Sequence, residues 1–81
     1  MNSLFEISMK TELKNLYYWL GKVNKSILTG ENCFFESNFA AQAAHKIDLY
    51  KEQFKNQYEK CDWLELVCTA KKRADEELKN E

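Results

Sequence analysis

The chain has 81 residues, a formal net charge of −1, no proline and only two glycines. This length predicts one small domain, residues 1–81, and the near-neutral charge argues against a nucleic-acid-binding protein or an acidic DNA mimic. Because so few residues can form tight turns, we expect an all-α protein built as a small antiparallel helical bundle.

Targeting and redox signals point to a cytoplasmic protein. No run of 18 apolar residues exists, so we expect no membrane-spanning helix, and residues 1–10 lack the basic and apolar regions of a signal peptide. The three cysteines, Cys33, Cys61 and Cys68, are an odd number without C-x-x-C spacing. On one helix, Cys61 and Cys68 would have Cα atoms about 10.5 Å apart, too far for a disulfide. Free thiols of this kind are typical of a reducing compartment.

The first predicted helix organises the chain. It can begin at Ser3, where Glu6 completes a capping box, or only at Ser8, and Gly30 occupies the position that favours a left-handed residue after a helix. Its apolar residues recur every three or four positions and form one seam: Met9, Leu13, Leu16, Leu20, Val23 and Ile27. Gly21, inside the helix, indicates either an exposed position or the close approach of another backbone.

The second predicted helix runs from about Asn32 to Tyr58, with Asn32 or Ser37 as its N-cap. Its apolar face recurs at helical spacing: Phe35, Phe39, Ala43, Ile47, Tyr50, Phe54, Tyr58 and Cys61. Small residues on this face allow close packing. We expect the seam of the first helix to dock on residues 43–54.

The last segment allows two architectures. Asp62 can cap a new helix with Glu65 three residues later, which gives a three-helix, up-down-up bundle. The absence of Gly and Pro after Gly30 instead allows the second helix to continue, straight or kinked, into a long hairpin. The cap and a shift of the apolar stripe near Cys61 favour a break.

Few residues could support catalysis or bind a cofactor. His45 is the only histidine, so a Cys-His pair with Cys33 or Cys61 would need it as the base, and a lone helical histidine is more often structural. The spacing of the cysteines and His45 does not match a zinc site, and two isolated glycines cannot form a phosphate-binding loop. We therefore expect no enzyme, cofactor or metal.

The aromatic residues are the remaining functional signal. Six of them exceed what a thin helical core obviously encloses, and we take them as candidate interface residues: Tyr17, Tyr18, Trp19, Phe34, Phe35 and Trp63. The hypothesis is a protein–protein interaction module that associates with itself or another protein. It would be a small adaptor, assembly factor or inhibitor, of the kind that mobile elements often encode.

Two alternatives stay open. One is a helical oligomer that binds a small ligand in a pocket between subunits, lined by Tyr17, Trp19 and Tyr50. The other is a nucleic-acid-binding regulator, which the lysines and Arg73 near the end of the chain favour only weakly, because acidic residues follow them at once.

Overall fold

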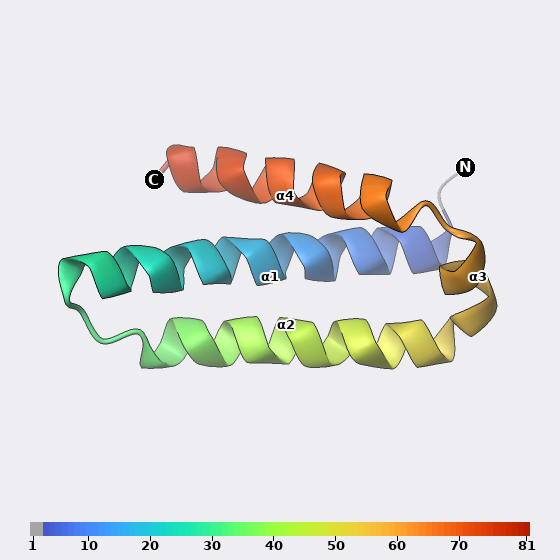
Figure 1. Ribbon diagram of the computed structural model, residues 1–81, viewed down its shortest axis with the longest axis horizontal. Helices are drawn as coiled ribbons and strands as arrows, with labels where there is room; N and C mark the ends of the chain where they lie inside the picture. The colour runs from blue at the N-terminus through green and yellow to red at the C-terminus, as the bar shows by residue number, and fades with distance from the viewer. Residues whose placement is uncertain (1–2) are drawn as a thin grey trace.

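The computed structural model describes residues 3–81 and contains four helices: α1 (Leu4–Thr29), α2 (Phe34–Gln53), α3 (Lys55–Lys60) and α4 (Trp63–Lys79) (Figure 1). No strand occurs in this range. α1 lies in the middle, α2 runs antiparallel to it on one side, and α4 runs parallel to it on the other. The predicted all-α, up-down-up bundle is confirmed.

The helices form a single layer. α1 packs along both α2 and α4, whereas α2 and α4 hardly touch each other. The described chain measures 43 × 22 × 16 Å. α1 therefore has a neighbour on each side, and each of α1, α2 and α4 contributes three of the nine buried apolar residues.

Both ends of α1 follow the predicted capping. The Ser3 Oγ accepts a hydrogen bond from the Glu6 amide at 3.2 Å, so the helix begins at the earlier of the two predicted starts. Gly30 adopts φ 75°, and its amide and that of Glu31 donate to the carbonyls of Ile27 and Ser26. This Schellman arrangement satisfies the last carbonyls of the helix.

The second helix is shorter than the predicted span from Asn32 to Tyr58. It begins at Phe34, whose amide donates to the Asn32 side chain at 2.9 Å, and it is interrupted at Phe54, where φ is −114° and ψ is 43°. The sequence gives no warning of this break, because neither Gly nor Pro is present. At the break the Phe54 ring packs on Phe5 of α1, with ring centroids 5.8 Å apart.

The predicted break before Asp62 is also present. The Asp62 side chain accepts a hydrogen bond from the Glu65 amide at 3.1 Å and caps α4. Between the two breaks, α3 makes only six residues of helix, and Cys61 is extended with ψ 159°. The chain thus turns the corner in two steps and returns along the far side of α1.

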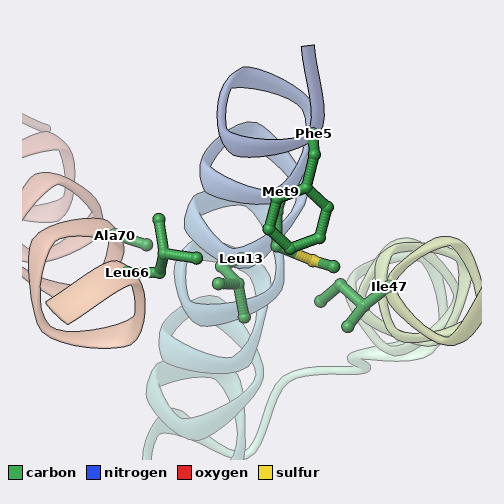
Figure 2. Close-up of a cluster of buried hydrophobic side chains, with 6 residues drawn as sticks. All are labelled: Phe5, Met9, Leu13, Ile47, Leu66 and Ala70. Carbon is green, nitrogen blue, oxygen red and sulfur yellow. The ribbon is translucent and has the colours of Figure 1, made fainter. Parts of the chain in front are cut away.

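The core lies near the beginning of α1. Figure 2 shows Phe5, Met9 and Leu13 on α1, with Leu66 and Ala70 of α4 approaching from one side and Ile47 of α2 from the other. Half-buried residues of α2, α3 and α4 pack around them, among them Tyr50, Phe54, Tyr58, Trp63 and Val67. This half of α1 is enclosed on its sides and on its apolar face.

The second half of the predicted seam is not enclosed. Met9 and Leu13 are 0% and 3% exposed, whereas Leu20 and Ile27, at the same helical face, are 41% and 62% exposed. The expectation that the whole seam docks on α2 is therefore wrong for its last turns. The reason is the single-layer architecture, in which α2 and α4 lie beside α1 and only the corner around α3 covers its apolar face.

Gly21 marks the place where the end of α4 meets α1. A Cβ atom at this position would collide with the Cδ1 of Leu78. Neither predicted explanation is observed as stated, because Gly21 is half-buried and a side chain of α4, not another backbone, approaches it.

Candidate functional site

The three consecutive aromatics of α1 all make contacts within the chain. Tyr17 packs against the core. The Tyr18 hydroxyl donates a hydrogen bond to the Glu81 carboxylate, beyond the end of α4. Trp19 packs on Phe39 of α2, with ring centroids 4.7 Å apart and an angle of 32° between the rings. All three are half-buried, so they join α1 to each of its neighbours.

Polar contacts hold the end of α4 against α1. The Lys22 ammonium pairs with the Glu81 carboxylate, and Lys14 pairs with Glu77 at 3.2 Å. The hydrogen bond that Glu81 accepts from Lys22, followed by the one that it accepts from Tyr18, lowers the pKa of Glu81, and donation to Glu81 raises the pKa of Tyr18. The ammonium groups of Lys14 and Lys22 also lie 5.9 and 5.6 Å, respectively, from the centre of the Tyr18 ring. This cluster fastens two helices together.

Trp63 has a comparable structural role at the other end. Its ring packs edge-on against Tyr58 at a centroid distance of 5.3 Å, and the Lys51 ammonium lies 4.8 Å from its centre. These contacts link the start of α4 to α2 and α3 across the corner. Trp63 remains only half-buried.

Phe34 and Phe35 differ from the other four candidates because they are mostly exposed. They open α2, pack on each other with ring centroids 5.7 Å apart, and are 62% and 71% exposed. Two large aromatic side chains in water forgo the stabilisation that burial would give. They are the strongest interface candidates among the six.

Four further apolar residues lie exposed at the same end of the molecule, and sequence reasoning missed their exposure. Leu28 is the most accessible, at 87%, and the others come from the last turns of α1 and the second turn of α2. We call these four residues and the two phenylalanines, taken together, the apolar end: Leu20, Ile27, Leu28, Phe34, Phe35 and Phe39. In Figure 1 these segments flank the loop that joins α1 to α2, the end farthest from α3.

The different lengths of the helices explain why this end is uncovered. α1 has 26 residues and spans about 39 Å, whereas α4 has 17 and spans about 26 Å. Leu28 follows Gly21 by seven residues, which is two turns, so it lies on the side of α1 that Leu78 of α4 covers at Gly21. The first predicted helix is longer than the helix predicted after Asp62, so its last apolar residues extend past the end of that helix. This difference in length was the signal in the sequence that could have found these exposed residues.

Charges are sparse at the apolar end. From Ser26 to Phe35 the only ionisable side chain, apart from the thiol of Cys33, is that of Glu31. Lys25 and Glu36 flank the segment with opposite signs. Interface cores are likewise depleted in charged residues.

Residues with possible catalytic chemistry lie apart from one another. The Cys61 thiol donates to the Tyr58 carbonyl at 3.0 Å, and burial raises its pKa, which disfavours the nucleophilic thiolate. The Ser37 hydroxyl contacts the sulfur of Cys33, whereas His45 is exposed on α2. Within residues 3–81, no three His, Cys, Asp or Glu side chains are grouped so that they could hold a metal ion.

Within one chain, the three residues predicted to line a pocket between subunits have different surroundings. Trp19 lines a shallow hollow between α1 and α2 with polar neighbours that include Glu12 and Lys46. Tyr17 and Tyr50 instead pack against the core cluster. Glu12, although largely buried, lies 4.0 Å from the Lys46 ammonium.

Comparisons with protein-family models, curated proteins and solved structures found no match to this chain. Among residues 3–81, no helix combines the length and the apolar character needed to cross a bilayer.

Proposed function

We propose that this chain is a cytoplasmic protein–protein interaction module that acts by contact and not by catalysis. Its binding surface is the apolar end, and the three-helix layer serves to hold α1 and α2 rigidly behind that surface. As a small adaptor, assembly factor or inhibitor, it would act by occupying a surface of its partner.

The observation that carries this proposal is the exposure of two neighbouring phenylalanines and of Leu28 beside the loop that joins α1 to α2, although other apolar residues, such as Leu4 and Leu64, are exposed elsewhere. Phe34, Phe35 and Leu28 are each more than 60% exposed although α1 and α2 hold them in ordered helices. Large apolar groups that are both exposed and preorganised cost little conformational entropy when a partner covers them. Aromatic residues are also enriched among the residues that dominate interface energies.

The proposed site differs from the one expected from the sequence in a specific way. Tyr17, Tyr18, Trp19 and Trp63 are now proposed to support the surface through their contacts within the chain. Phe34 and Phe35 are proposed to contact the partner directly.

Site-specific photocrosslinking tests the proposal. A photoreactive phenylalanine analogue replaces Phe35 in one variant and Leu64 in a matched control. Both positions are the second residue of a helix and both are 71% exposed, but Leu64 lies at the opposite end of the molecule. Irradiation in the cells that make the protein should give discrete protein adducts from position 35 and not from position 64. Adducts from neither position, or equally from both, would contradict the proposal.

A further inference from the structure

We infer that the hollow between α1 and α2 binds a guanidinium group, with the Glu12 carboxylate as its counter-ion. The hollow has a volume of about 180 Å³. Its lining is mostly polar and comes from both helices: Glu12, Asn15, Trp19, Phe39, Gln42 and Lys46. The inference concerns a single chemical group and does not depend on the proposed function.

Glu12 is an acidic residue that the fold buries without giving its carboxylate a hydrogen bond. Its side chain is only 10% exposed. Within residues 3–81 the carboxylate accepts no hydrogen bond, and the Lys46 ammonium, at 4.0 Å, lies beyond hydrogen-bonding distance. Burial of a carboxylate without hydrogen bonds is destabilising, so a donor group that enters the hollow gains a strong, charge-assisted acceptor.

The other polar groups of the hollow favour a planar cation. Asn15 and Gln42 each carry an amide oxygen, and neither side chain makes a hydrogen bond within the described residues. A guanidinium has five N–H donors in one plane, so it can pair with both carboxylate oxygens and still donate to neighbouring amides. Trp19 adds an aromatic ring, and guanidinium groups also bind such rings.

The size of the hollow favours a guanidinium over an ammonium. An ammonium concentrates its charge and its three donors at one atom. A volume of about 180 Å³ is far larger than that of one water molecule, about 30 Å³, so most of the space around an ammonium would remain filled with water.

Lys46 is the competitor of this ligand within the chain. Its side chain is 56% exposed, so its ammonium can move into solvent when a ligand enters. Its positive charge partly neutralises Glu12 and repels a second cation. Removal of this charge should therefore strengthen binding, a result that a purely structural Glu12–Lys46 pair does not predict.

An NMR titration of the purified chain tests the inference. The probe is N-acetyl-arginine N-methylamide, in which the backbone charges are blocked. The indole N–H signal of Trp19 should shift saturably with a Kd of about 1 mM, and that of Trp63, which does not line the hollow, should not. The corresponding citrulline derivative has the same planar shape without the charge. This derivative and the lysine derivative should each bind at least about tenfold more weakly.

Three variants assign the binding to the hollow. Glu12→Gln keeps the size of the side chain and should raise the Kd at least about tenfold. Lys46→Gln should lower it roughly threefold. Glu52→Gln, at an exposed glutamate of α2 outside the hollow, is the control and should leave it unchanged. Circular dichroism should show the same helicity for all three, and Lys46→Gln decides the question even if Glu12→Gln does not fold.

Free arginine identifies the source of the guanidinium. If the blocked derivative binds at least as well as free arginine, the ligand is an arginine side chain of a protein. Tighter binding of free arginine indicates the free amino acid, whose carboxylate would reach Lys46. The inference is overturned if Trp19 shows no saturable shift up to about 50 mM probe, if the citrulline derivative binds equally well, or if Lys46→Gln fails to strengthen binding.

Discussion

The two halves of α1 have the same sequence pattern and opposite surroundings. Met9 and Leu13 belong to the half that is closed by Phe54, Tyr58 and the corner of the chain, and they are buried. Leu20 and Ile27 continue the same seam and are exposed. Helical periodicity therefore shows which face of a helix is apolar, but not whether a neighbour covers that face.

The difference follows from the number of elements that meet at each end. Near Phe5, the two breaks at Phe54 and Cys61 fold α3 close to the start of α1 (Figure 1). At the far end, a short loop joins α1 to α2 and α4 does not reach the last turns of α1. In this one-layer bundle, the core therefore forms at the end where α3 and the residues around it fold over the start of α1.

The largest expected effect comes from truncating the same residue type in each half. Leu13→Ala should lower the free energy of unfolding by about 2–5 kcal/mol, because it leaves a cavity in the core. Leu28→Ala should change it by no more than about 0.5 kcal/mol, since the side chain is 87% exposed. Urea unfolding of dilute protein measures both. Equal losses would mean that the two halves are enclosed alike.

Gly21 lies at the boundary between the two halves of α1. The effect of its substitution on the free energy of unfolding should depend on Leu78. Alanine in a helix interior is favoured over glycine by about 1 kcal/mol, but here the added methyl group meets the Leu78 side chain. Gly21→Ala should therefore be neutral or destabilise by up to about 2 kcal/mol. In a Leu78→Ala background the same change should stabilise by about 1 kcal/mol. A thermal-unfolding double-mutant cycle measures this coupling, and additive effects would place Leu78 elsewhere.

The cap of α4 should matter for the enclosed half. Asp62→Ala removes the acceptor of the Glu65 amide and should cost about 1 kcal/mol, whereas Asp62→Asn should retain most of the stability. Amide hydrogen exchange should show the loss of protection first at the beginning of α4. An alanine variant as stable as the asparagine variant would contradict the role of the cap.

The smallest effect concerns the polar contacts at the end of α4. Because Lys22 and Tyr18 lower the pKa of Glu81, its contribution is present above the ordinary pKa of glutamate and is lost as the pH falls through the lowered value. Glu81→Gln should slightly reduce the loss of melting temperature on acidification. Glu76→Gln, at an exposed glutamate of α4 that makes no ion pair within residues 3–81, is the control and should change the pH profile less than Glu81→Gln does.

For the other partner, Tyr18, the dependence on pH runs in the opposite direction, because its contribution is lost at alkaline pH. The raised pKa of Tyr18 means that its contribution is complete below the ordinary pKa of tyrosine and is lost as the pH rises through the raised value. Tyr18→Phe should therefore flatten the alkaline side of the stability profile. An unchanged profile would indicate that the hydroxyl does not hold Glu81 in solution.

Local signals in the sequence were sufficient for the helices and most of their ends. The caps at Ser3, Gly30 and Asp62 are confirmed, because each depends on hydrogen bonds between residues three to five positions apart. The all-α class followed from the shortage of turn residues and from the helical spacing of apolar side chains. These features act within one helix and can be read along the chain.

Tertiary structure alone decided the break at Phe54, the placement of α4 and the exposure of the apolar end. Phe54 interrupts the second predicted helix at a point where its ring packs against Phe5, nearly 50 residues away in the sequence. Leu13 and Ile27 belong to the same helical repeat of apolar residues in the sequence. In the structure, only Leu13 has α4 and the segment around α3 packed against it. Burial depends on which segments meet in space, and periodicity within one helix carries no information about where its neighbours end.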